Sequence, residues 1–301
     1  MEPTSSPVVL PQNSPPKESF KGSFWRQLKE IFLILLIAVF VRTFLIGLYQ
    51  VPTGSMETTM LIGERFFADK LSYFFRAPTH SEIVALMQPN YEFSQDPFWQ
   101  FVERNLFGPQ NWTKRVIACP GDHIRGVIEN GMPVVYLNGS KLDEPYLNQY
   151  PLIAIQNSCA GGYTRRSYDP SAGFHAQPFY QIEEDTIYVD TSGKPYLTYP
   201  NQAKPLSIPA SLRDERYWGE CADEFDVKLE SDEYWVMGDN RRGSQDSRYF
   251  GPIKQDTIFA HITWLLFSID SNESWIVLDF IKNPVQFIKK IRLNRTLKRL
   301  V

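Results

Sequence analysis

The feature that most limits how this chain can fold is the apolar run IFLILLIAVFVRTFLIGLY, from Ile31 to Tyr49. As an α-helix with a rise of about 1.5 Å per residue, this run would span about 28 Å, close to the thickness of a bilayer's hydrocarbon core. A buried core helix is the alternative, but no face of the part from Ile31 to Val41 is polar. The run therefore predicts a single transmembrane anchor, which we place at residues 24–49.

The charges on either side of this run predict the orientation of the anchor. The stretch from Gln50 to Lys70 carries only two basic residues, Arg65 and Lys70. More positive charge lies on the amino-terminal side, at Lys17, Lys21, Arg26 and Lys29. The positive-inside rule then puts the amino terminus in the cytoplasm and the body of the protein outside it. A cleavable signal peptide is disfavoured by the long proline-rich leader and by the lack of an Ala-x-Ala site near Gln50.

Composition limits what the rest of the chain can be. Hydrophobic residues make up 43% and charged residues 22%, as in a globular protein with a real core, and a net charge of -3 gives no reason to expect nucleic acid as a partner. Four scattered histidines show no metal-ligand spacing, so we expect no metal. Cys119 is expected to be a buried free thiol, whereas Cys159 and Cys221 could pair.

The body of the chain is predicted to be mainly β, as an antiparallel, barrel-like sheet domain behind one transmembrane helix. Short β-branched and aromatic runs such as TKRVIACPGDHI and DEYWVMGDN are bounded by turn residues. Residues 1–23 are expected to form a disordered cytoplasmic leader. The sheet domain is assigned to residues 50–147 and 228–275, with a loop-rich second β lobe inserted at 148–227. Residues 276–301 form a basic amphipathic tail, either a solvated helix or a membrane-surface contact.

A serine just beyond the anchor raises the question of chemistry. Ser55 lies in VPTGSMETTM, near where the chain would leave the membrane. No histidine is a convincing partner, since His123 lies in a turn and His261 in an apolar strand. A neutral lysine can replace histidine as a general base, but neutrality near pH 8 requires lowering the pKa from its ordinary value by about 2.4 units, or about 3 kcal/mol. Lys114, in the apolar context WTKRVIACPGD, fits that need, although a surface lysine beside a strand is the simpler interpretation.

A third segment, MGDNRRGSQDSRYFGP, follows an aromatic strand and is dense in short polar side chains. Taken together and in this order, PTGSM, TKRVIACPGD and GDNRRGSQDSRYFG behind one apolar anchor resemble the sequence motifs of bacterial type I signal peptidases, which are membrane-bound serine endopeptidases with a Ser-Lys dyad. The segments GERFFADK and VYLNGSKLDEPY are also similar to that family. The resemblance covers Phe40 to about Ala260, without matching residues 148–227 in detail.

The resemblance implies a role for each matching residue. Ser55 would be the nucleophile and Lys114 the general base, with Ser244 donating to the lysine amine and Thr53 helping the Ser55 backbone N–H to form an oxyanion hole. The residues that would brace this site are Asp239, Arg241, Asp246, Arg248 and Arg115. Four positions depart from the family pattern, none of them a reacting group: Thr58 replaces a proline, Glu64 an aspartate, and Arg242-Gly243 an Asp-Asn pair.

The same resemblance implies the substrate and the location of the protein. Signal peptides of exported preproteins would bind extended beside an edge strand and be cut after small residues at positions -1 and -3. The candidate wall of this site comprises Met56, Ile83, Val84, Ala85 and Met87. We expect no cofactor, a monomer, a lipid bilayer as the other partner, and a location in the cytoplasmic membrane with the catalytic domain on the extracytoplasmic side.

Four other kinds of protein deserve comparison. A self-cleaving repressor would need a DNA-binding motif and no anchor, and a penicillin-binding-type acyltransferase would need Ser-x-x-Lys on one helix. A signal peptidase of narrower substrate range stays open. A catalytically inactive scaffold is opposed by the joint presence of Ser55, Lys114 and Ser244.

Overall fold

The structure is a computed structural model that describes residues 20–89, 91–105, 108–157, 162–199, 221–271 and 276–300. The chain divides into two compact units, residues 1–42 and 43–301. The first unit is described from residue 20 onward and consists of helix α1, Phe20–Phe40. Residues 20–23, which we assigned to the disordered leader, are helical, and the rest of the assigned leader, residues 1–19, lies outside the described residues.

We expected the apolar run to form one helix as far as Tyr49, but it does not. Helix α1 ends at Phe40, a five-residue π-turn covers Val41–Leu45, and Ile46–Gln50 forms strand β1. Strand β1 pairs in antiparallel register with β2, Arg65–Asp69, so backbone hydrogen bonds to a neighbouring strand take the place of helical ones. Among the described residues, no helix combines the length and the apolarity that a membrane crossing requires. The transmembrane span is thus not confirmed.

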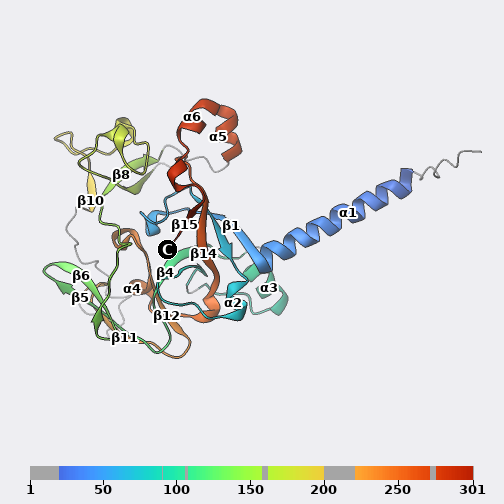
Figure 1. The fold of residues 1–301 in the computed structure, drawn as a ribbon, viewed down its shortest axis with the longest axis horizontal. Coiled ribbons are helices and arrows are strands. Elements are labelled where there is room, and N and C mark those ends of the chain that lie inside the picture. Colours follow the sequence, from blue (N-terminus) through green and yellow to red (C-terminus); the bar gives the residue numbers. More distant parts are fainter. Residues whose placement is uncertain are drawn as a thin grey trace, which may run out of the picture. The chain divides into compact units, whose positions relative to one another are not determined.

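The mainly β prediction for the second unit is confirmed. Its largest sheet has eight strands in the order β1-β2-β14-β3-β4-β12-β13, with β15 paired to β14 (Figure 1). Every strand pair among the described residues is antiparallel. The bounds of the remaining strands of this sheet are β3 Ile83–Met87, β4 Asn111–Ala118, β12 Glu233–Met237, β13 Ile253–Lys254, β14 Ile258–Phe267 and β15 Lys298–Arg299.

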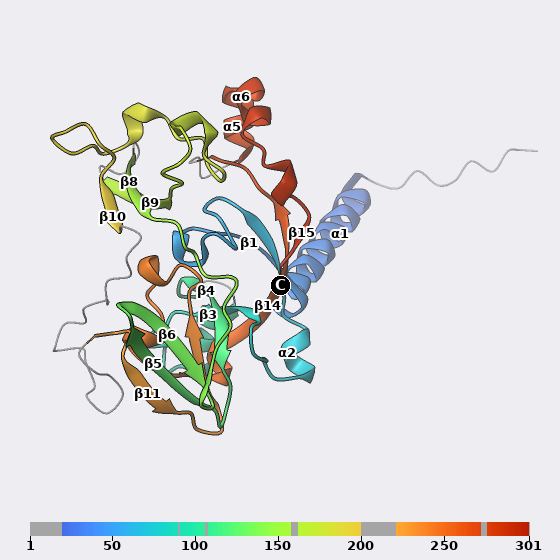
Figure 2. The ribbon, with the colours of Figure 1, turned by 60° about the vertical axis from the view of Figure 1, so that its left-hand side comes forward.

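Two smaller sheets accompany the large one (Figure 2). One has the order β11-β5-β6-β7, with bounds β5 His123–Glu129, β6 Met132–Leu137, β7 Ser140–Lys141 and β11 Phe225–Lys228. The other has the order β10-β8-β9, with bounds β8 Leu152–Asn157, β9 Gly162–Ser167 and β10 Leu197–Tyr199. The β8–β10 sheet lies within the expected second lobe. The segment 225–227, assigned by sequence to the same lobe, pairs instead with β5.

The core explains why the run IVALM becomes a central strand. In β3 all five residues are buried, and alternate side chains enter different apolar clusters. Ile83 and Ala85 pack with Met56 and Met60, whereas Val84 and Leu86 belong to a second cluster. A strand buried on both faces reads as a continuous apolar run, not as an alternating one.

Short helices connect the strands, and the carboxyl-terminal tail is more broken than a single amphipathic helix would be. Helix α5, Ile276–Lys282, is followed by α6, Pro284–Lys289, with Pro284 at the start of the second helix. The chain then returns to the large sheet as β15. The other helical segments are α2 Ser72–Phe75, α3 Pro97–Asn105, α4 Ser247–Phe250, and the 3₁₀ turns Gly54–Met56, Phe174–Ala176, Glu184–Thr186, Arg241–Gly243, Gln255–Thr257 and Leu293–Arg295.

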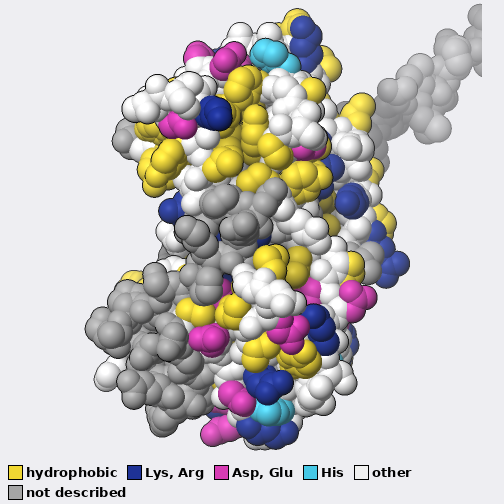
Figure 3. All heavy atoms as spheres, turned by 90° about the vertical axis from the view of Figure 1, so that its left-hand side faces the viewer, with side chains coloured by type: hydrophobic (Ala, Val, Ile, Leu, Met, Phe, Trp, Pro, Cys, Tyr) yellow, Lys and Arg dark blue, Asp and Glu magenta, His cyan; other side chains and the backbone are white. Residues whose placement is uncertain are grey.

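Part of the protein surface is apolar, and two of the three cysteines are described. On the face drawn in Figure 3, hydrophobic side chains gather toward the upper part of the view. Exposed apolar and aromatic residues of the second lobe include Tyr163, Tyr188 and Val189. Cys119 is half-buried and Cys221 is buried, and neither forms a disulfide with another described residue. Cys159, the other member of the possible pair, lies outside the described residues.

Candidate active site

Ser55 lies in a 3₁₀ turn, Gly54–Met56, that begins shortly after β1 ends. Its side chain is buried, with only 8% of the residue exposed. The turn is fixed by a residue from far along the chain, Asn240, whose backbone N–H donates to the Ser55 carbonyl at 3.1 Å. The Asn240 side-chain amide also donates to the Gly54 carbonyl at 2.8 Å. Two hydrogen bonds to successive carbonyls therefore hold the turn in place.

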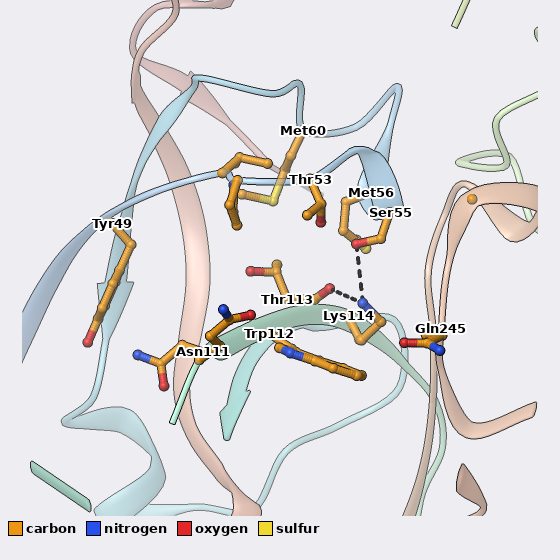
Figure 4. Close-up of a pocket in the computed structure, with 14 residues that line it drawn as sticks. Tyr49, Thr53, Ser55, Met56, Met60, Asn111, Trp112, Thr113, Lys114 and Gln245 are labelled. Atoms are coloured by element: carbon orange, nitrogen blue, oxygen red, sulfur yellow. Dashed lines mark hydrogen bonds between the residues drawn. The ribbon is translucent and has the colours of Figure 1, made fainter. Parts of the chain in front are cut away.

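Lys114 projects from β4 toward this turn. Its Nζ lies 3.2 Å from Ser55 Oγ, although 59 residues separate the two along the chain, and 3.1 Å from the Thr113 carbonyl (Figure 4). Only 4% of Lys114 is exposed. The Trp112 ring lies on another side of the amine, with its centroid 5.3 Å away. The structure thus brings together the serine and the lysine that the sequence analysis paired.

The electrostatic surroundings of Lys114 favour the neutral amine. Burial is the main cause, and it lowers the pKa of Lys114 from its ordinary value of 10.5 to about 8. The carboxylates of Asp246 and Asp239 oppose that change, while the positive charge of Arg248 adds to it. Near pH 8, about half of the molecules would hold an amine able to accept a proton from a hydroxyl within hydrogen-bond distance.

Ser55 and Lys114, the expected dyad, line a cleft of about 810 Å³. Thr53 is exposed and lies in this cleft beside Ser55 (Figure 4). The other residues of the lining are Tyr49, Val51, Pro52, Met56, Met60, Gln110, Asn111, Trp112, Thr113, Gly243 and Gln245. Apolar walls around a small set of polar groups are typical of sites that bind an extended peptide or a small ligand.

Ser244 lies close to the dyad, but the expected hydrogen bond to the lysine amine is not formed. Ser244 is buried, and its Oγ has no hydrogen-bond partner within the part of the chain that the structure describes. Gly238 makes this approach possible, because a Cβ at that position would stand 2.3 Å from Ser244 Oγ and 2.5 Å from the Ser55 carbonyl oxygen. The prediction was wrong in this detail because a hydroxyl can rotate between acceptors, which a motif does not specify.

The residues expected to brace the site form buried ion pairs around it. Arg115 Nε and Nη2 donate to the two carboxylate oxygens of Asp239 at 2.9 and 2.8 Å. Arg248 donates in the same way to Asp246, at 2.8 and 2.9 Å, and also to Asp223 at 2.7 Å. Such two-pronged pairs fix both partners, because planar guanidinium and carboxylate groups match.

Asp246 and Arg241 connect these pairs to the strand that precedes the loop. Asp246 Oδ2 accepts from the Gly238 backbone N–H at 2.9 Å. Arg241 donates to the Gly238 carbonyl at 3.2 Å and to the carboxylate of Glu144. The dense polar turn is therefore packed inside the protein, as its short side chains suggested.

The predicted substrate wall is only partly correct. Met56 lines the cleft, but Ile83, Val84, Ala85 and Met87 do not. These four lie in β3, which pairs with β14 on one side and β4 on the other. A strand paired on both sides has no free backbone groups to offer a substrate, so no peptide can add to it. The sequence could not distinguish a central strand from an edge strand in so short an apolar run.

Several residues that shape the site escaped the sequence analysis. Asn240 fixes the serine turn, and Trp112 and Gln245 line the cleft. Glu57, two residues after Ser55, is completely buried. A charged residue two positions after Ser55 was the available signal for Glu57, but nothing in the local sequence indicates that its side chain points inward.

We expected no metal-ligand cluster, yet His80, Cys119 and Asp122 bring one ligand atom each within 4.8 Å of one another. Their contacts fit a hydrogen-bonded group. Asp122 accepts from Asn138 and from the Cys119 backbone N–H, and lies 2.6 Å from His80 Nε2. Burial raises the pKa of the Cys119 thiol to about 12, which disfavours the thiolate that a metal would require. We therefore assign no ion to this cluster.

Comparison with known proteins decides the family. The family model described as "Signal peptidase, peptidase S26" matches residues 24–267. The chain belongs to this family. A probable signal peptidase I-2 of Synechocystis is 31% identical over 253 residues, covering 84% of this chain and 78% of that protein. Signal peptidase I of Buchnera aphidicola from Acyrthosiphon pisum is 25% identical over 264 residues, covering 86% of this chain and 80% of the relative.

A solved signal peptidase I from Enterococcus faecalis was also found, at 19% identity and a TM-score of 0.27. It covers 62% of this chain and 97% of its own. That structural similarity is too weak to support an argument about the fold. Membership in the signal peptidase family rests on the sequence matches.

Proposed function

We propose that this member of the signal peptidase family is a serine endopeptidase that removes signal peptides from exported preproteins with Ser55 as nucleophile and Lys114 as general base. The observation that carries the proposal is the 3.2 Å contact between Ser55 Oγ and a buried Lys114 amine whose pKa is lowered to about 8. An uncharged amine can take a proton, and a buried one at this distance can take it from that serine.

The chemistry then proceeds in two stages. Lys114 takes the Ser55 proton while Oγ attacks the carbonyl carbon of the scissile bond. The lysine returns the proton to the leaving amine, so the peptide bond breaks and an ester to Ser55 remains. In the second stage Lys114 takes a proton from water, the hydroxide attacks the ester, and Ser55 recovers its proton as the signal peptide leaves with a carboxylate.

The oxyanion of each stage needs hydrogen-bond donors near Ser55. We assign this role to the Ser55 backbone N–H and the Thr53 hydroxyl, supported by the place of Thr53 in the same cleft. A hydroxyl is sufficient here because a single O–H donor is what the position must supply.

The substrate would lie extended in the cleft, with small residues at positions -1 and -3 fitting the apolar wall. Met56 and Met60 together with Trp112 supply apolar surface beside the dyad. We also propose that the protein works at the outer face of the cytoplasmic membrane, as a monomer attached by α1. Exposed apolar side chains along this helix support that attachment, among them Ile34, Leu35 and Ile37, each at least 51% exposed.

The test is processing of a purified preprotein, followed by identification of the new amino terminus. We expect Ser55→Ala and Lys114→Ala to reduce cleavage by at least about 1000-fold, because each removes a reacting group. Lys254→Ala is the matched control, since Lys254 is an exposed lysine of the same unit and should leave cleavage within about twofold of the unmodified protein. Equal processing by all four proteins would reject the dyad, and no processing by any would reject the peptidase activity.

A further inference from the structure

Glu57 is a buried carboxylate whose position the catalytic scheme does not explain. It follows Ser55 by two residues, and none of its surface is exposed. A Cβ placed on Gly54 would stand 2.9 Å from Glu57 Oε1, so the carboxylate packs directly against the turn that carries the nucleophile. Glu57 does not line the cleft. It therefore touches the backbone of the serine turn without facing the substrate.

The partners of this carboxylate come from β9 and from the segment between β9 and β10. The Ser167 backbone N–H and hydroxyl donate to Oε2 at 3.0 and 2.8 Å, and the Tyr180 hydroxyl donates to Oε1. Ser167 is the last residue of β9. A fully buried carboxylate with three donors is held in one orientation, because leaving any of them unpaired in the interior is costly.

These contacts form part of a closed ring of hydrogen bonds. The Asn148 side-chain amide donates to Ser167 Oγ at 2.8 Å, and the Asn148 backbone N–H donates to the Asp239 carbonyl at 2.9 Å. The residue after Asp239 is Asn240, which donates to the carbonyls of Gly54 and Ser55. The ring thus runs from the serine turn through Glu57, Ser167 and Asn148, and back to the same turn.

We infer that Glu57 is a positioning residue through which the second lobe fixes the serine turn and so directs Ser55 Oγ at the Lys114 amine. Asn240 holds the turn from one side by its carbonyls, and Glu57 holds it from the other through side-chain contacts. With either side released, the turn can rotate about the remaining contact, and the Oγ–Nζ distance of 3.2 Å is no longer imposed. Small displacements of a nucleophile cost large factors in rate. The inference rests on the proposed function.

The alternative is that Glu57 merely stabilises the fold. The two roles differ in what they predict for kcat and for the backbone at Asn240. A positioning role lowers kcat while leaving KM within about twofold, because Glu57 lies outside the cleft. It also increases hydrogen exchange at the Asn240 amide, whose acceptor is the Ser55 carbonyl. A purely structural role lowers the melting temperature, but it leaves kcat and the hydrogen exchange at Asn240 unchanged in the folded protein.

The experiment uses the full chain with Tyr180→Phe, Glu57→Gln and their combination. Tyr180→Phe removes one donor to Glu57 and nothing else from the ring. Tyr73→Phe is the matched control, since Tyr73 also donates to a carboxylate, that of Glu82 at 2.7 Å, but away from the ring. Each protein is assayed for preprotein cleavage and for hydrogen exchange at Asn240.

We expect Tyr180→Phe to lower kcat about 10-fold, Glu57→Gln to lower it at least as much, and the double variant to match Glu57→Gln because both changes break one ring. Exchange at Asn240 should rise in these variants and stay unchanged in Tyr73→Phe. If Tyr180→Phe folds and retains both the kcat and the Asn240 exchange of the unmodified protein, the inference is overturned. An unmodified protein that cleaves no preprotein, but shows the exchange pattern, would reject the proposed function and leave the ring intact.

Discussion

Burial of the Lys114 amine reduces the stability of the folded protein at neutral pH. In the proposed function, the same burial makes the amine available as a base. Burial lowers its pKa to about 8 from the ordinary value of 10.5, so the folded state binds fewer protons than the unfolded state between these two pH values. Stability therefore rises with pH across this range, and the cost of the buried amine is complete below about pH 8. The difference corresponds to about 3 kcal/mol.

Lys114→Met should therefore give a protein that is more stable and inactive. Methionine fills a similar volume without a charge to desolvate, so we expect the free energy of unfolding at pH 7 to rise by about 1–3 kcal/mol. The gain should disappear above about pH 10.5, where the unfolded lysine is neutral as well. Urea unfolding at pH 7 and at pH 10.5 measures both quantities, and a variant that is less stable at pH 7 would contradict the burial argument.

At this scale the sequence predicted the reacting pair but not its surroundings. The Ser55–Lys114 contact was expected because three motifs resembled those of a known family, whereas the apolar neighbours of Lys114 were only compatible with a buried amine. The unpartnered hydroxyl of Ser244 could not be predicted, since a motif gives the residue type and not the partner of its hydroxyl. Glu57 could not be predicted either, since its partners lie more than 100 residues away.

At the scale of secondary-structure elements, hydropathy alone does not distinguish a helix from a buried strand, or a central strand from an edge strand. Residues 46–49 continue the apolar run of the predicted anchor, but they form β1 because a partner strand, β2, lies alongside. Apolar residues suit a helix and a buried strand equally well, and only the pairing decides. Strand β3 illustrates the same limit, since five apolar residues in a row cannot reveal whether the strand is central or at an edge. The overall β class was predictable because turn residues and β-branched runs recur along the whole body.

A buried ion pair between Arg295 and Glu64 helps to hold the carboxyl-terminal segment. Arg295 Nη2 donates to Glu64 Oε2 at 3.0 Å, and its Nε also contacts Glu64 Oε1. Ser268 donates to the same carboxylate at 2.6 Å. Glu64, which replaces the aspartate usual in the family, is the longer side chain and reaches both partners. The tail is thus fastened to the core beside the serine segment.

Arg295→Met should destabilise the protein by about 3–5 kcal/mol, because it leaves the Glu64 carboxylate buried without its cation. Adding Glu64→Gln to this variant should restore part of the loss, since the unpaired charge is then removed. Chemical unfolding of the two variants and the unmodified protein provides the measurement. An equal or larger loss in the double variant would show that the ion pair is not the source of the effect.

At the scale of the whole molecule, the site is assembled from segments far apart in the sequence. The turn after β1 supplies Ser55, strand β4 supplies Lys114, and the loop after β12 supplies Ser244. One of the two smaller sheets contacts the segment of the serine turn, because Ser167 of β9 donates to Glu57. Sequence order could not reveal that arrangement, although the order of the motifs matched the family.

The proposed attachment to a membrane through α1 concerns the whole chain. We expect the full chain to float with phospholipid vesicles in a density gradient, because apolar side chains of α1 are exposed along its second half. A chain that begins at Thr43, the start of the second compact unit, should remain at the bottom while still cleaving a soluble peptide substrate. Flotation of both chains alike would place the membrane contact elsewhere, and flotation of neither would reject the attachment.

The most direct test of the central claim is titration of the Lys114 side chain by NMR in protein labelled at the lysine Cε, with Lys114→Met to identify its signal. We predict a midpoint near pH 8. Because the base must be neutral to act, kcat/KM for a preprotein should rise tenfold per pH unit below that value and level off above it. A Lys114 midpoint near 10.5, as for a solvent-exposed lysine, would contradict the account.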